Sequence, residues 1–179
     1  MSDCKPVSTP LDPGVKLEKA KDPDHEENSL PYRELLRSLM YLAMCTRPDI
    51  AYATSYLSQF NNCYNINHWT AVKRVLRYLQ RTKNVGLHFY RSGKSLEGCV
   101  DADWANCSND RKSYTGFSFI LGGSSVSWES RKQRTVALSS TEAEYMALAE
   151  AGKEAAYLKR FLKELGLSKT LYNVNNNYY

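Results

Sequence analysis

The strand-like segment that organises the second half of this chain is Glu97–Trp104, with the sequence EGCVDADW. Its apolar centre and the polar, loop-like stretch Asn106–Ser113 that follows predict a strand from Leu96 to Asp101. Asp101 would then be a carboxylate at the end of a strand. An aspartate there is also common as a turn or capping residue, and that alternative fits Asp103 even better.

A long helix is predicted to begin within Ser139–Tyr145, SSTEAEY. Ser139 and Glu142 have the spacing of a capping box, which accounts for Glu142. Glu144 is not needed for the cap. Because it precedes Leu148 by four residues, we expect it on the same side of the helix as an apolar position, facing a sheet. In the alternative interpretation, Glu144 only interacts favourably with the helix dipole.

A strand end and a helix start that each carry a carboxylate can together hold Mg²⁺ for phosphodiester chemistry. Asp101 and Glu144 are therefore the candidate catalytic and metal-ligating residues. A buried carboxylate needs such compensation, because an unpaired charge away from water is unfavourable. Sites of this kind normally contain more than two carboxylates.

Three further strands are predicted between the helical first half and this long helix. Alternating apolar residues indicate strands at Val85–Tyr90, Gly116–Leu121 and Ser125–Glu129, and Gly122-Gly123 predicts a turn between the last two. The long helix is expected to end before Gly166, and a further strand to begin after it.

The first half reads as an arm followed by helices. Residues 1–28 are rich in proline and charge and lack an apolar period, so we expect a flexible arm. Apolar residues at helical spacing predict helices near Ser29–Cys45, Pro48–Asn62 and Asn67–Arg81. In the first of these, Ser29 is a candidate cap.

Basic side chains lie on and after the third predicted helix. The chain carries a net charge of +5, which is a weak indication of a polyanionic partner. The helix face is either a solvated exterior or a surface that follows nucleic-acid phosphates. The candidate nucleic-acid-binding residues are Lys73, Arg74, Arg77 and Arg81.

Several classes of protein are disfavoured by what the sequence lacks. Five cysteines without a C-x-x-C pair, and three dispersed histidines, argue against zinc and against a disulfide framework. There is no nucleophile elbow, phosphate-binding loop or dinucleotide fingerprint. No signal peptide is apparent, and the longest apolar stretch, Leu35–Ala43, is too short to cross a membrane. We expect an intracellular protein, cytoplasmic or nuclear, that does not act at a membrane.

Three groups of longer motifs follow one another along the chain. They are Tyr32–Leu42 and Thr46–Ala53; His68-Trp69 with Lys73–Leu79; and Asp101–Ala105, Asp110–Ser113, Ser127–Trp128, Lys132–Gln133 and Val136–Tyr145. In sequence and order, these motifs resemble the Pol polyprotein of Ty1/copia-type retrotransposons, and the resemblance runs from about Asp3 to Val174. The first two groups resemble the region after the polymerase core, and the third group resembles the ribonuclease H domain.

The resemblance implies an α+β, or mixed α/β, architecture. A helical connection region, residues 29–84, would precede an incomplete ribonuclease H-like domain, residues 85–174, with residues 175–179 as an unmatched tail. Asp101 matches the first catalytic aspartate of the family and Glu144 the catalytic glutamate. The implied activity is hydrolysis of the RNA strand of an RNA/DNA hybrid with two Mg²⁺ ions, beside an upstream polymerase part whose palm motif this chain lacks.

The resemblance stops after Val174, before the strand and helix that carry the third and fourth carboxylates of the family. Two carboxylates do not balance two divalent ions, so we expect poor Mg²⁺ binding and little or no hydrolysis. Two alternatives stay open. The chain is a non-catalytic nucleic-acid-binding remnant that uses the basic helix 67–83, or another chain completes an active enzyme.

Overall fold

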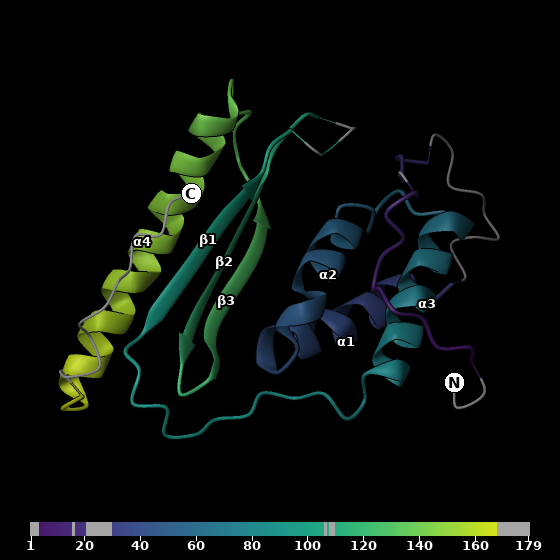
Figure 1. The fold of residues 1–179 in the computed structure, drawn as a ribbon. Helices are drawn as coiled ribbons and strands as arrows, with labels where there is room; N and C mark the ends of the chain where they lie inside the picture. Colours follow the sequence, from purple (N-terminus) through teal and green to yellow (C-terminus); the bar gives the residue numbers. More distant parts are fainter. Residues whose placement is uncertain (1–3, 16, 21–29, 106, 108–109, 168–179) are drawn as a thin grey trace. The chain divides into compact units, whose positions relative to one another are not determined.

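The structure, a computed structural model, describes residues 4–15, 17–20, 30–105, 107 and 110–167. These residues form a mixed α+β fold of helices and one antiparallel sheet (Figure 1). The chain divides into two compact units, one ending at Gly86 and the other beginning at Leu87. Across the described ranges, no helix has the length and apolarity that crossing a membrane requires.

The first unit contains the three predicted helices, with shifted boundaries. They are α1 (Tyr32–Cys45), α2 (Ala51–Ser58), which follows the short 3₁₀ helix η2 (Pro48–Ile50), and α3 (Ile66–Arg81). α1 ends before the Arg47-Pro48 pair, as expected from the restriction that proline places on the preceding residue. The predicted cap Ser29 lies outside the described residues.

α3 begins with a complete capping box. The side chain of Asn65 accepts hydrogen bonds from the backbone N–H groups of Asn67 and His68. The Nδ1 atom of His68 in turn accepts from the backbone N–H of Asn65, at 3.0 Å. Because these bonds satisfy donors that a helix start leaves open, α3 begins one residue earlier than the apolar pattern alone predicts.

The core of the first unit is aliphatic and aromatic. Tyr32 is fully buried and donates its hydroxyl to the carbonyl of Leu57, at 2.8 Å. Its ring stacks on Tyr64, with centroids 4.6 Å apart. Phe60 is also fully buried, against His68. The other buried core residues are Leu17, Leu36, Leu39, Ala43, Ile50, Ala53, Leu57, Val72 and Val75.

The described residues of the N-terminal segment, 4–15 and 17–20, lack helix and strand, as their composition predicts, but they are packed rather than detached. Leu17 is only 4% exposed and belongs to the core of the first unit. The backbone N–H of Ala20 donates to the carbonyl of Cys63 at 3.1 Å. Leu17 thus helps to hold a segment that has no apolar period of its own. The remaining residues of the predicted arm, 1–3, 16 and 21–28, lie outside the described residues.

The second unit is a three-stranded sheet with one long helix. The strands β1 (Glu97–Asp103), β2 (Tyr114–Leu121) and β3 (Ser124–Lys132) are antiparallel neighbours in the order β1-β2-β3. The helix α4 (Ser140–Glu164) packs along β1 and β2 (Figure 1). The strand predicted after Gly166 falls almost entirely outside the described residues.

The prediction of a strand at Val85–Tyr90 is wrong. The segment has no regular structure, and Val85 and Phe89 are 60% and 58% exposed. Its backbone bonds lead to the β2–β3 turn, where the N–H of Tyr90 donates to the carbonyl of Gly122 at 2.8 Å. Isolated bonds to a turn do not form a ladder, so alternating apolar residues alone were an insufficient signal.

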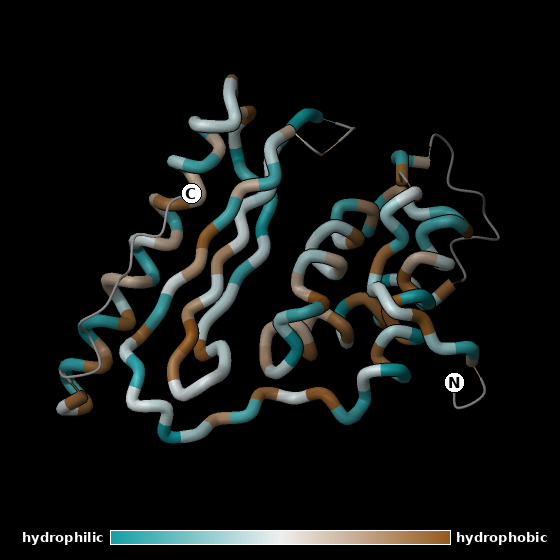
Figure 2. The backbone as a smooth tube through the Cα atoms, viewed as in Figure 1, coloured by the Kyte–Doolittle hydropathy of each residue, from teal (hydrophilic) through white to brown (hydrophobic). Residues whose placement is uncertain are grey.

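Side chains alternate across the sheet, and one face forms the core with α4. The hydrophobic residues of the sheet lie mainly on β1 and β2, whereas β3 is mostly hydrophilic (Figure 2). Val100 pairs with Phe117, and both belong to the cluster that contains Ala151 and Leu162 of α4. A Cβ atom on Gly98 would lie 2.6 Å from the ring of Phe119, so a side chain there would displace a core aromatic residue.

Candidate functional site

Asp101 lies within β1 rather than at its end, because the strand continues to Asp103. It pairs with Gly116 of β2 and is exposed. Since Val100 packs into the core with α4, alternation places Asp101 on the opposite face of the sheet. The carboxylate is therefore available to solvent close to the end of the strand.

Glu144 lies in the second turn of α4 and is exposed, so the prediction that it faces the sheet is wrong. In the first half of the helix the buried residues are Ala143, Ala147 and Ala151, while Leu148 is 39% exposed. Small alanines let the helix approach the sheet closely, and Leu148 was therefore a misleading guide to the inward face.

Only half of the predicted capping box is present at the start of α4. The backbone N–H of Glu142 donates to Oγ of Ser139 at 3.1 Å, as predicted. The carboxylate of Glu142 accepts instead from the backbone N–H of Leu138, at 2.6 Å. Glu142 is still occupied by local capping, so Glu144 is the carboxylate of this region that the cap does not use.

The two elements that carry Asp101 and Glu144 meet at one end of the sheet, where β1 finishes and α4 starts (Figure 1). Two side-chain hydrogen bonds connect segments of the chain at this end. Nε1 of Trp104, directly after β1, donates to the carbonyl of Ala137 at 3.4 Å. Nε2 of Gln133 donates to the carbonyl of Ala143 at 2.9 Å. The site thus consists of two solvent-exposed carboxylates on elements that hydrogen bonds hold together.

These residues do not fit a tightly held pair of metal ions. Within residues 4–167, apart from the stretches the structure leaves undescribed, no group of three or more His, Cys, Asp or Glu side chains is placed to hold an ion. Asp101 and Glu144 are too few to hold two divalent ions, and carboxylates exposed to water attract a cation only weakly. No catalytic step through metal ions follows from this geometry.

The predicted nucleic-acid-binding residues of α3 fall into two groups. Lys73 and Arg81 are exposed to solvent. The Nζ atom of Lys73 lies over the ring of Trp69, 5.6 Å from its centroid, which keeps the stem of the lysine along the helix surface. These two cations present their charge outward.

Arg74 and Arg77 are instead half-buried and bind the N-terminal segment. Arg74 donates from Nη2 to Oγ1 of Thr9 at 2.9 Å and forms a 3.5 Å ion pair with Asp12. Nε of Arg77 donates to the carbonyl of Lys5 at 2.7 Å. At least one N–H of each guanidinium group is therefore already used within the first unit.

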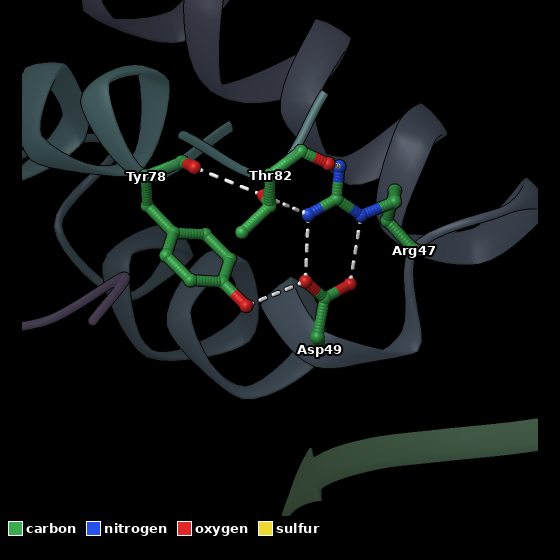
Figure 3. Close-up of polar contacts among 4 residues, drawn as sticks. All are labelled: Arg47, Asp49, Tyr78 and Thr82. Atoms are coloured by element: carbon green, nitrogen blue, oxygen red, sulfur yellow. Dashed lines mark hydrogen bonds and ion pairs between the residues drawn. The ribbon is translucent and has the colours of Figure 1, made fainter. Parts of the chain in front are cut away.

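A polar cluster ties the start of α2 to the end of α3 (Figure 3). Arg47 binds the carboxylate of Asp49 with two hydrogen bonds, from Nε at 2.9 Å and from Nη2 at 2.7 Å. The hydroxyl of Tyr78 donates to the same carboxylate at 2.8 Å. Arg47 also donates to the carbonyl of Thr82, the residue that follows α3, at 3.3 Å.

The cluster shifts the pKa of each charged member. Burial alone would raise the pKa of Asp49, but hydrogen bonds from Arg47 and Tyr78, together with the positive charge, lower it below its usual range. The hydrogen bond to Asp49 raises the pKa of Arg47. The ion pair is therefore the stable form at neutral pH, and its place between helices indicates a structural role.

Sequence reasoning treated Gln133 and the Arg47–Asp49 pair only as parts of longer motifs. The cluster had a local signal, since an arginine and an aspartate flank Pro48 two residues apart. Gln133 had none, because its side-chain partners Thr115 and Ala143 are 18 and 10 residues away. Only the folded arrangement identifies it.

Comparison with known proteins gives matches to curated sequences, whereas no family model and no solved structure matches the chain. The retrovirus-related Pol polyprotein from transposon TNT 1-94 of Nicotiana tabacum is 47% identical over 179 residues, 97% of this chain and 14% of that polyprotein. The corresponding polyprotein from transposon RE1 of Arabidopsis thaliana is 42% identical over 177 residues, 95% of this chain and 12% of the relative.

A shorter relative covers the same sequence. Secreted RxLR effector protein 161 of Plasmopara viticola is 53% identical over 131 residues, which are 73% of this chain and 92% of that protein. The chain thus spans nearly all of the named effector but only a small part of the length of either polyprotein.

Proposed function

Because this chain belongs to the family of Pol polyproteins from copia-type retrotransposons, we propose that its second unit derives from a ribonuclease H domain. The domain would hydrolyse the RNA strand of RNA/DNA hybrids in an intact polyprotein. Asp101 and Glu144 are its cation-binding carboxylates, with Mg²⁺ as the physiological ion. Residues 29–84 correspond to the connection region, whose partner is the upstream polymerase part.

One observation carries this proposal. β1 ends and α4 begins at the same edge of the second unit (Figure 1), and Asp101 of β1 and Glu144 of α4 are both exposed, with Asp101 on the sheet face away from α4. A strand–helix pair of carboxylates is the arrangement that orients a cation beside a phosphodiester. Two carboxylates hold one ion loosely, so we propose residual cation binding without efficient hydrolysis.

The cation site is tested by titrating the protein with Mn²⁺ while recording backbone amide NMR spectra. We expect paramagnetic broadening of signals from both residues 100–103 and residues 142–146, with half-saturation on the order of 1 mM, as for weak carboxylate sites. Asp101→Asn or Glu144→Gln should each remove the broadening from both segments.

Glu164→Gln is the matched control, because it removes an exposed carboxylate at the other end of α4. This variant should broaden like the wild type. Broadening confined to β1 or to α4 alone, or broadening that survives both site variants, would show that the two carboxylates do not share a cation.

The alternative function is binding of nucleic acid without catalysis, through α3. Arg74 and Arg77 are engaged by oxygen acceptors of the N-terminal segment, so the observation in its favour concerns the other two basic residues of the helix. Lys73 and Arg81 present positive charge to solvent on the same helix. Such a surface would bind hybrids weakly and without base specificity.

The salt dependence of hybrid binding tests this alternative. Each phosphate contact contributes a slope of roughly −0.9 to the logarithm of the binding constant against the logarithm of salt concentration. Lys73→Glu with Arg81→Glu should therefore flatten the slope by about 2. Lys153→Glu, which changes an exposed lysine of α4, is the control. An unchanged slope in the double variant would eliminate α3 as the binding surface.

The cellular location is also a proposal. We propose an intracellular protein, cytoplasmic or nuclear, since the polyprotein matches cover 95–97% of this chain and the match to the secreted effector covers 73%. Secretion is a property named for that relative. Fractionation of cells that express the tagged chain distinguishes an intracellular protein from a secreted one. Recovery mainly from the medium would contradict the proposal.

A further inference from the structure

α4 is held against the sheet by different interactions at its two ends. Towards its C-terminal end, Leu158 and Leu162 pack with the aromatic residues of β2. At its N-terminal end the buried side chains are only Ala143 and Ala147. Two methyl groups bury little apolar area, so packing alone fixes the first turns weakly.

The side chain of Gln133 holds the first turn of α4 against the sheet through hydrogen bonds. Gln133 is 7% exposed and follows β3 directly. Its backbone N–H donates to the carbonyl of Ser113 at 2.8 Å, which fixes it to the start of β2. Its Nε2 donates both to Oγ1 of Thr115 at 3.1 Å and to the carbonyl of Ala143 at 2.9 Å. One amide group therefore joins the sheet to the first turn of the helix.

The orientation of this amide follows from its partners. The carbonyl of Ala143 can only accept a hydrogen bond, so the N–H side of the Gln133 amide must face it. Both N–H groups are then used, while Oε1 is buried without a hydrogen-bond partner among the described residues. Because a buried unpaired oxygen is unfavourable, the contribution of this side chain lies in its two donors.

The partners of Gln133 adjoin the two candidate carboxylates. Thr115 stands opposite Ala102 in the ladder, one residue from Asp101. Ala143 precedes Glu144. We propose that Gln133 is a positioning residue that fixes the start of α4, which carries Glu144, against β2, the strand that pairs with the Asp101 strand β1. Its link to the carboxylates rests on the proposed function, whereas its hold on α4 does not.

The test substitutes the amide by its isosteric acid. In Gln133→Glu the ionised side chain has no donor for the Ala143 carbonyl, so the first turns of α4 should open more often. We expect hydrogen exchange of the amides of residues 144–148 to be about tenfold faster, with residues 158–162 unchanged. The Mn²⁺ affinity of the Asp101–Glu144 pair should fall by roughly threefold or more while circular dichroism stays that of the wild type.

Protonation provides a rescue within the same variant. The carboxyl group introduced by Gln133→Glu regains one donor when the pH falls below its pKa, about 4.3 for an unperturbed glutamate. The ratio of the exchange rate in the variant to the exchange rate in the wild type, measured at the same pH, should then return towards one. The matched control is Gln59→Glu, which removes an equivalent donor to the carbonyl of Tyr56 in the first unit. It should leave α4 exchange and Mn²⁺ affinity unchanged.

The possible outcomes distinguish the positioning role of Gln133 from the proposed function of the carboxylate pair. Wild-type exchange and wild-type Mn²⁺ affinity in Gln133→Glu would overturn the positioning role. If that variant does not fold, Thr115→Val provides a second test, because it removes the bond from Gln133 to Thr115 without adding charge. It should change the exchange rates and the Mn²⁺ affinity in the same direction as Gln133→Glu, but by a smaller amount. No shared Mn²⁺ broadening in the wild type would overturn the proposed function alone, because the exchange comparison uses no metal.

Discussion

Replacing Phe60 by alanine is expected to lower the free energy of unfolding of the first unit by about 4 kcal/mol. Phe60 is 0% exposed and lies between Tyr56 and His68, with ring centroids 5.7 Å and 4.3 Å away. The substitution removes buried apolar surface and leaves a cavity that helices α2 and α3 cannot fill completely. A loss of this size approaches the total stability of many small domains.

Urea denaturation followed by hydrogen-exchange mass spectrometry measures this effect, because peptides from residues 32–81 and 97–164 report the two units separately. The control is Phe89→Ala, whose ring is 58% exposed; it should change stability by less than about 0.5 kcal/mol. A loss below about 1 kcal/mol in Phe60→Ala would contradict the central place of this residue in the core.

Asp49→Ala is expected to destabilise the first unit by about 3 kcal/mol. The substitution leaves the guanidinium of Arg47, whose side chain is 11% exposed, without its partner, and it removes the acceptor for Tyr78. The estimate is at the low end for a broken buried pair, because the Asp49 side chain is itself 31% exposed. Asp12→Ala breaks a more exposed pair with Arg74 and should cost less than about 1 kcal/mol.

The same pair predicts how stability depends on pH. The pKa of Asp49 is lower in the folded state than its unfolded value of about 3.9. Its contribution is therefore fully present above about pH 4 and is lost as the pH falls through the folded pKa. The difference in stability between wild type and Asp49→Ala should shrink at acidic pH. A difference that stays constant down to about pH 2 would show that Asp49 is not held ionised by Arg47.

Local signals predicted the helices of the first unit well. The apolar spacing of α1 and the proline after Arg47 act within a few residues, so they can be read from the sequence. The exact starts were less accurate, since the Asn65 and His68 capping box extended α3 by one residue.

Predictions failed where distant partners decide the outcome. The alternation of Val85 and Phe89 is that of a strand, yet within the described part of the chain no neighbouring strand pairs with this segment. Leu148 marked the wrong face of α4 because the buried residues in the first half of this helix are alanines. Periodicity reports which residues share a face, but it does not report which face is buried.

In the candidate site, too, local patterns could be predicted from the sequence and long-range contacts could not. The sequence motifs assigned Glu142 to the helix cap, where its carboxylate indeed bonds to the backbone, whereas the roles predicted for Asp101 and Glu144 stay predictions. The role of Gln133 could not be predicted, because its bonds connect residues that only the fold brings together. The same holds for the N-terminal segment, whose acceptors occupy Arg74 and Arg77.

Incubation of the purified chain with Mg²⁺ and a labelled RNA/DNA hybrid tests most directly whether this carboxylate pair supports hydrolysis by itself. We predict no cleavage above the background of the Asp101→Asn variant, because two carboxylates cannot hold and orient a pair of divalent ions. Mg²⁺-dependent cleavage by the wild-type chain that Asp101→Asn abolishes would contradict the account.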